Sequence, residues 1–152
     1  MNTIVNFLFA AIKAGTPLLF GTTGEIITEK AGNLNLGVEG LMYMGAFVGF
    51  LVGFYTESLL LSLLAAFGAG VLGSLIYAFL TVTLKANQNV TGLTLTIFGT
   101  GFANFFGEML IAATKGGAPK LSAKFSAKLA EIQIPLLSDI PYLGRALFSH
   151  NI

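Results

Sequence analysis

The chain has 152 residues, of which 55% are hydrophobic and only 10% are charged; its mean hydropathy is +0.82 and its net charge is +1. A soluble domain usually carries about 25% charged residues, so this composition excludes an ordinary soluble domain, and the absence of a basic patch excludes nucleic-acid binding. Without cysteine there are no disulfides, thiolate metal sites or cysteine nucleophile, and the single histidine, His150, excludes a multi-histidine metal centre. We therefore expect a membrane protein that has no metal or other cofactor.

Four apolar runs follow one another along the chain. A hydrocarbon core about 30 Å thick requires ~20 apolar residues in a helix, and each run is long enough. The third run contains no charged residue, whereas each of the others contains one or two. The sequence therefore predicts an all-α, polytopic membrane protein with about four transmembrane helices. The runs are 4–27, 34–55, 58–84 and 90–114.

The second and third runs are separated only by Thr56 and Glu57, which predicts a tight antiparallel hairpin. Small residues recur at every fourth position in both runs, and rows of this kind allow helices in lipid to approach closely. We expect the rows to pack within one subunit; dimerisation through them is the alternative. The rows are Gly45, Gly49 and Gly53 in the second run, and Ala66, Gly70, Ser74 and Ala78 in the third.

The fourth run carries a polar stripe in which Thr96, Thr100, Asn104 and Glu108 lie four residues apart along one helical face. Amides and carboxylates that face lipid are costly, so the stripe should face protein or a water-filled cavity. Hydrogen bonding between helices and the lining of a transport pathway both remain open as interpretations. Lys13 in the first run also needs a partner or an aqueous neighbour, and Glu108 is one candidate for it.

The segment after the fourth run has the pattern of a short amphipathic helix near 119–132. Lys120, Lys124 and Lys128 repeat every four residues, and Pro119 suits the first turn of such a helix. Apolar residues repeat beside the lysines, which predicts a helix lying in the headgroup region. We interpret it as a packing element, and 141–148 as a second short interfacial helix. The apolar residues are Leu121, Phe125 and Leu129.

The segment 31–40, AGNLNLGVEG, interrupts the apolar pattern where the first and second runs meet. Asparagine and glycine favour non-helical backbone. Irregular backbone at membrane depth is tolerated only when it is buried in protein or lines a cavity, and interrupted helices often build transport pathways. An ordinary turn at the membrane interface is the alternative.

This break also identifies a resemblance. Residues 16–47, TPLLFGTTGEIITEKAGNLNLGVEGLMYMGAF, resemble the amino-terminal half of a permease from an ATP-binding cassette importer. The family is shared by branched-chain amino acid, simple-sugar and nucleoside uptake systems. The form E-x-x-G-x-x-N-x-G-x-E-G from Glu29 to Gly40, together with residues 79–101, is similar to the nucleoside or simple-sugar branch.

The resemblance implies a multi-pass permease subunit in the cell membrane that moves a nucleoside or a related small polar solute. It implies no catalytic residue here, because ATP hydrolysis belongs to a separate cytoplasmic ATPase subunit. The other implied partners are a second permease subunit, an extracytoplasmic substrate-binding protein and the lipid bilayer. It further places the segment 115–147 and the amino terminus outside the cell, and the segments 28–36 and 85–89 inside it.

Permeases of this kind are about twice as long, and their second half carries the coupling loop that docks on the ATPase. We therefore expect residues 1–152 to form the amino-terminal half of a transmembrane permease domain. A self-contained oligomeric channel or a membrane scaffold protein is the alternative. The residues that we expect along the substrate pathway are Asn33, Asn35, Glu39, Thr96, Thr100 and Asn104.

Overall fold

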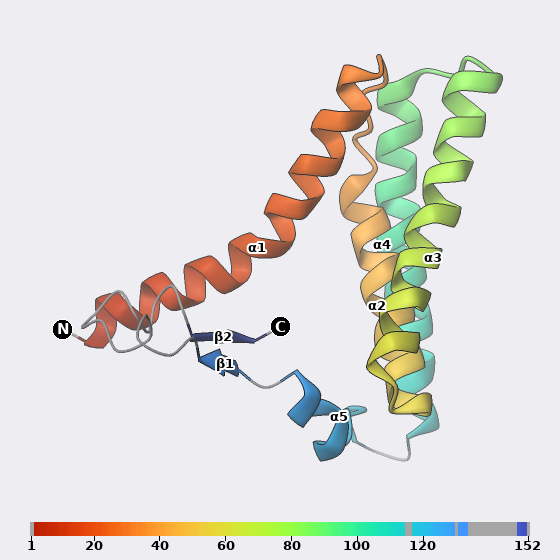
Figure 1. Cartoon of the computed structure of the whole chain (residues 1–152). Helices are drawn as coiled ribbons and strands as arrows, with labels where there is room; N and C mark the ends of the chain where they lie inside the picture. The colour runs from red at the N-terminus through yellow and green to blue at the C-terminus, as the bar shows by residue number, and fades with distance from the viewer. Residues whose placement is uncertain (1, 115–116, 130, 134–148, 152) are drawn as a thin grey trace.

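The computed structural model describes residues 2–114, 117–129, 131–133 and 149–151. The described part is almost entirely helical, with one pair of three-residue antiparallel strands (Figure 1). Four helices are long and apolar enough to cross a membrane, which confirms the predicted all-α fold with about four spans. The elements are α1 (Asn2–Lys30), α2 (Val38–Thr56), α3 (Leu59–Ala78), the π-helical turn η1 (Phe79–Thr83), α4 (Gln88–Ala113), α5 (Ala123–Lys128), β1 (Glu131–Gln133) and β2 (Ser149–Asn151).

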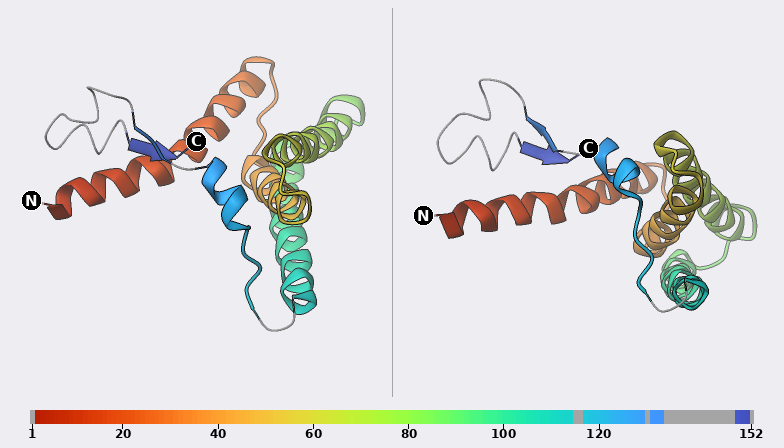
Figure 2. Two further views of the ribbon diagram at one scale, coloured as in Figure 1. Left: turned by 60° about the horizontal axis from the view of Figure 1, so that its bottom comes forward. Right: turned by 90° about the horizontal axis from the view of Figure 1, so that it is seen from below.

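Helices α2, α3 and α4 lie side by side as a bundle, and α1 leans away from it toward the amino terminus (Figures 1 and 2). The carboxy-terminal part of α1 meets the bundle, where Gly21 lies against Met42 and Val38 of α2. The rest of α1 carries large exposed apolar side chains, as a helix surrounded by lipid does. The core of the described region therefore lies between α2, α3 and α4.

The predicted hairpin of α2 and α3 is confirmed. Glu57 ends α2 in the left-handed conformation, at φ 52°, and its N–H donates to the carbonyl oxygen of Gly53. Ser58 then caps α3. The glycine row of α2 packs on α3: a methyl group at Gly45 would lie 3.3 Å from the carbonyl oxygen of Ala66. Such close approach is what small residues allow in lipid.

The predicted small-residue row of α3 is only partly correct. Ala66 lies at the contact with α2, but Gly70 has open space beside it, and Ser74 and Ala78 are exposed. The helix turns 100° per residue, so a row at every fourth position moves around the helix by about 40° at each step. The buried face of α3 instead continues through Ala69, Gly73 and Tyr77.

Replacing Ser62 with alanine should weaken the hairpin. The Ser62 hydroxyl donates a 2.6 Å hydrogen bond to the carbonyl oxygen of Gly49 across the helix contact. Hydrogen bonds between membrane helices contribute about 0.6 kcal/mol on average and at most about 1.7 kcal/mol, so we expect a loss within this range. Reversible unfolding in mixed micelles measures it. Ser74→Ala on the same helix is the control, and an equal loss there would show that the predicted row, not the observed one, faces α2.

Helices α2 and α4 cross at a pair of glycines, Gly40 and Gly99. A methyl group added at Gly99 would overlap the backbone of Gly40, and one added at Gly40 would overlap the carbonyl oxygen of Leu95. Farther along, the ring of Phe47 on α2 packs edge-on against Phe102 of α4, at 6.0 Å between centroids. The two helices therefore meet backbone to backbone at the first turn of α2 and the middle of α4, and they contact each other through aromatic rings farther along.

The amphipathic helix predicted near 119–132 is shorter in the structure, where α5 spans six residues. Ser122 begins it, because the Ser122 hydroxyl accepts a hydrogen bond from the N–H of Phe125. A capping serine at this position fixes the first turn, so the helix does not start at Pro119. The second interfacial helix predicted at 141–148 lies outside the described residues.

Candidate functional site

The break between α1 and α2 is a folded, non-helical segment, Ala31–Gly37. Gly32 has φ +88°, which a residue without a Cβ adopts freely. Its N–H donates to the carbonyl oxygen of Glu29, and the N–H of Asn33 donates to that of Thr28, so the last turn of α1 is closed. Helix α2 begins only at Val38. The predicted interruption of the helical pattern is therefore present.

Leu34, at the centre of this segment, has both of its backbone polar groups bonded to other helices. Its N–H donates to Oε1 of Gln88 at 2.8 Å, and its carbonyl oxygen accepts from the Tyr77 hydroxyl at 2.6 Å. Gln88 Nε2 also donates to the carbonyl oxygen of Gly32 at 3.2 Å and to Oδ1 of Asn33 at 3.3 Å. A single side chain at the start of α4 thus bonds three residues of the break.

The next two residues are held by α1 and α4. The N–H of Asn35 donates to Oε1 of Glu25 at 2.7 Å, and the carbonyl oxygen of Leu36 accepts from the Thr96 hydroxyl at 2.8 Å. Backbone groups outside a helix need such partners wherever water cannot reach them. Side chains from α1, α3 and α4 therefore replace the hydrogen bonds that a continuous helix would have made.

The segment also lies directly against the backbone of α4. A methyl group at Gly92 would lie 2.7 Å from the backbone nitrogen of Leu36, and one at Gly37 would lie 3.0 Å from the carbonyl oxygen of Gly92. Asn35 is buried, and its Oδ1 accepts from the N–H of Gly37 at 2.9 Å, which closes a local turn. The fit leaves no room for a side chain at either glycine.

Among the six residues predicted to line a pathway, the structure brings Asn33, Asn35 and Thr96 together at the break. The Thr100 hydroxyl bonds to carbonyl oxygens one turn earlier in α4, those of Thr96 and Ile97. The other two, Glu39 and Asn104, are exposed on α2 and α4.

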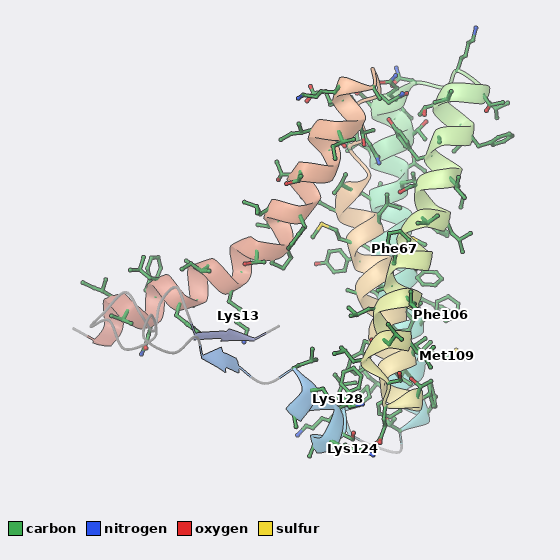
Figure 3. All side chains as sticks on the ribbon, in the orientation of Figure 1. Lys13, Phe67, Phe106, Met109, Lys124 and Lys128 are labelled. Carbon is green, nitrogen blue, oxygen red and sulfur yellow. The ribbon has the colours of Figure 1, made fainter. Side chains whose placement is uncertain are left out.

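The charged residues of the spans stay apart. Glu108 is exposed near the end of α4, and Lys13 is exposed on the splayed part of α1 (Figure 3). Within the part of the chain that the structure describes, these two side chains form no ion pair. The pairing considered from the sequence is therefore not found here.

Sequence reasoning missed three side chains that build the site: Glu25, Tyr77 and Gln88. Glu25 offers a signal, since it is a carboxylate inside an apolar run. Its Oε1 is bonded, but its Oε2 is buried and has no hydrogen-bond partner among the described residues, which costs about 1–3 kcal/mol for a polar group. Gln88 and Tyr77 offer no comparable signal, because their role depends on which helices meet.

The polar groups at the break are amides, hydroxyls and one carboxylate, and most of them bond to backbone. Such groups hold a backbone shape and do not supply a nucleophile with its base. The fold and the site thus define a polytopic α-helical membrane protein with an internally braced, non-helical connection between two of its spans.

Comparison with known families shows to which family of membrane proteins the chain belongs. Residues 6–137 match the family described as the permease component of branched-chain amino acid transport systems. The chain belongs to this permease family, as its resemblance had predicted, and it is a multi-pass membrane protein.

Three relatives match nearly all of the chain. TsgC13 of Haloferax volcanii, whose name assigns it to a glucose ABC transporter as a permease, is 35% identical over 97% of the chain and 43% of its own length. The guanosine ABC transporter permease protein NupQ of Bacillus subtilis is 34% identical over 92% of the chain and 44% of its own length. The nucleoside ABC transporter permease protein NupC of Lactococcus lactis is 28% identical over 99% and 47%.

The chain therefore spans less than half the length of the relatives that it matches. No solved structure matches it.

Proposed function

We propose that the chain is the amino-terminal half of a permease subunit of an ATP-binding cassette importer, and that it helps to move a nucleoside or a related small polar solute across the cell membrane. The observation that carries this proposal is the family match over residues 6–137. The relatives named for guanosine, nucleosides and glucose favour a small polar substrate. ATP hydrolysis then falls to a separate ATPase subunit, and a second permease subunit and an extracytoplasmic binding protein complete the system.

The arrangement of the ends is compatible with the orientation implied by the family. Gln88 joins the loop between α3 and α4 to the break between α1 and α2, so both connections lie at the same end of the bundle (Figure 1). We assign this end to the cytoplasm. The opposite end, where α2 meets α3 and where α5 lies, then faces outward.

Uptake by intact cells tests the function. Deleting the gene that encodes the chain should abolish accumulation of at least one radiolabelled solute among guanosine, other nucleosides and glucose, and a plasmid copy should restore it. Collapse of ATP levels in the complemented strain should abolish uptake again. Unchanged uptake of all these solutes would contradict the proposed function, and restored uptake that persists without ATP would favour a self-contained channel.

We further propose that the outer face of α4 borders the aqueous pathway. Asn104 and Glu108 are exposed there, and Gly101, three residues before Asn104, has open space beside it. Polar side chains in spanning helices generally face a bundle interior or a water-filled cavity, because exposure to lipid is costly. Glu39, exposed in the first turn of α2, is the corresponding polar group nearer the cytoplasmic end.

Cysteine labelling checks this pathway prediction, and a chain without native cysteine suits it. A thiol reacts as the thiolate, which forms in water and not in lipid. In the complete permease, Asn104→Cys should react with a membrane-impermeant methanethiosulfonate at least about tenfold faster than Phe67→Cys. Phe67 is the control because its side chain is 72% exposed on α3, toward lipid in our assignment (Figure 3). Equal rates at both positions would place Asn104 outside the pathway.

A further inference from the structure

Helix α5 lies beside the end of the bundle at which α2 and α4 terminate and α3 begins (Figures 1 and 2). The ends of spanning helices mark the boundary between the hydrocarbon core and the headgroups. Large side chains at this level remain exposed: Tyr55 is 68% exposed and Leu60 is 67% exposed. An aromatic residue at a helix end is typical of the membrane interface. This position therefore places α5 at the depth of the lipid headgroups.

One side of α5 is anchored to the helical hairpin. Phe125 is only 2% exposed, and its ring fills the space above Gly53, where a methyl group would lie 3.0 Å from it. The Lys128 ammonium group donates a 3.1 Å hydrogen bond to the carbonyl oxygen of Glu57, at the turn of the hairpin. These two contacts hold α5 against the hairpin.

Two exposed lysines lie beside this anchor. Lys124 on α5 and Lys120 just before it are exposed, and neither has a protein partner among the described residues (Figure 3 labels Lys124 and Lys128). The segment 117–129 contains three lysines and no acidic residue. The acidic residues around this end of the bundle are Glu57 in the turn between α2 and α3, Glu108 near the end of α4, and Glu131 of β1. Neither Glu57 nor Glu108 forms an ion pair with these lysines among the described residues. Two unpaired ammonium groups thus remain at headgroup depth.

We propose that Lys120 and Lys124 bind the phosphate groups of anionic phospholipids. Basic residues at a membrane surface attract anionic headgroups, and an ammonium group donates hydrogen bonds to phosphate oxygens. The exposed apolar side chains beside the site favour a lipid over an acidic protein surface. The acyl chains of an anionic phospholipid can contact these apolar side chains while its phosphate group binds the lysines. Lipid bound here holds α5 in place and, through Phe125, secures the end of the hairpin at which α2 turns into α3. This inference does not depend on the transported solute.

Lipid retention tests the proposal with the full chain. The purified protein is stripped of lipid in a neutral detergent, titrated with phosphatidylglycerol or phosphatidylcholine, and examined by native mass spectrometry. The wild type should retain more phosphatidylglycerol than phosphatidylcholine. The double variant Lys120→Gln/Lys124→Gln should lose about three- to tenfold of its phosphatidylglycerol occupancy, with phosphatidylcholine unchanged. Lys85→Gln, at the other end of the bundle, is the matched control and should behave as the wild type.

The variant Lys120→Arg/Lys124→Arg separates charge from folding, because it keeps both cations and should keep the lipid. Equal retention of the two lipids by the wild type, or unchanged retention by the glutamine variant, would overturn the proposal. The proposal would also be overturned if the wild type showed no lipid preference and its lysines instead bound a purified acidic binding protein in a salt-sensitive way. Since uptake is not the readout, failure here leaves the proposed transport function intact.

Discussion

Replacing Gly99 with alanine is expected to force α4 away from α2. The added methyl group would overlap the carbonyl group and Cα of Gly40, which are backbone atoms that no rotamer change can move. Overpacking of this kind costs about 1–3 kcal/mol or more. Alanine is favoured over glycine in a helix by about 0.5–1 kcal/mol, which offsets part of this cost. We expect a net loss of about 2 kcal/mol in the free energy of unfolding.

Gly101→Ala is the matched control, two residues farther along the same helix. Nothing lies within 4 Å of the methyl group that it would add, so only the gain in helix propensity remains. Unfolding of both variants in mixed micelles, followed by circular dichroism, gives the comparison. If Gly99→Ala were as stable as Gly101→Ala, the backbone contact between α2 and α4 would not exist.

Replacing Gln88 with alanine should loosen the break between α1 and α2. It removes the acceptor of the Leu34 N–H and the donor to the Gly32 carbonyl oxygen, along with the bond to Asn33. A polar group left without a partner away from water costs about 1–3 kcal/mol. The Leu34 N–H is partly buried, whereas water can replace the partner of the exposed Gly32 carbonyl oxygen, so we expect a total loss of about 1–3 kcal/mol. Limited trypsin digestion reports the change, because Lys30 directly precedes the segment and cleavage after it should accelerate.

Two variants control this result. Asn89→Ala removes the exposed neighbour and should leave the cleavage rate unchanged. Gln88→Glu keeps an acceptor for the Leu34 N–H but loses the amide donor, so its rate should fall between those of the wild type and Gln88→Ala. A Gln88→Ala protein that is cleaved as slowly as the wild type would show that the other bonds suffice to hold the segment.

Apolar length and composition were enough to predict the four spans, the hairpin and the break. A run of 20 or more apolar residues has few alternatives to a membrane helix, and two residues between runs leave room only for a tight turn. The asparagines and glycines of the segment 31–40 favour non-helical backbone by themselves, without any tertiary contact. Each of these features depends on residues that are local in sequence.

Which face of a helix meets a neighbour was harder to predict. Residues at every fourth position drift around a helix, because the helical repeat is 3.6 residues. On α3 the row leaves the contact after Ala66. On α4 the polar stripe begins with Thr96 bonded to the break and ends with Asn104 and Glu108 exposed. The start of the predicted stripe therefore packs against the break, whereas its end forms an exposed face of α4.

The bracing side chains could not be predicted, for a different reason. Tyr77 and Gln88 lie 43 and 54 residues from Leu34, whose backbone they hold. These side chains reach the break only because α3 and α4 pack beside it, and no local sequence pattern predicts that packing. Glu25 lies ten residues from Asn35, and its position in an apolar run marked it as unusual without revealing its partner.

Amide hydrogen exchange within the break tests most directly whether it is a fixed part of the permease. In the reconstituted wild type, the N–H groups of Leu34 and Asn35 are bonded to side chains of α4 and α1. They should exchange as slowly as amides in the adjoining turns of α2. Exchange as fast as that of the exposed Lys85 between α3 and α4 would show that the break is an open loop, and would contradict the braced site on which this interpretation depends.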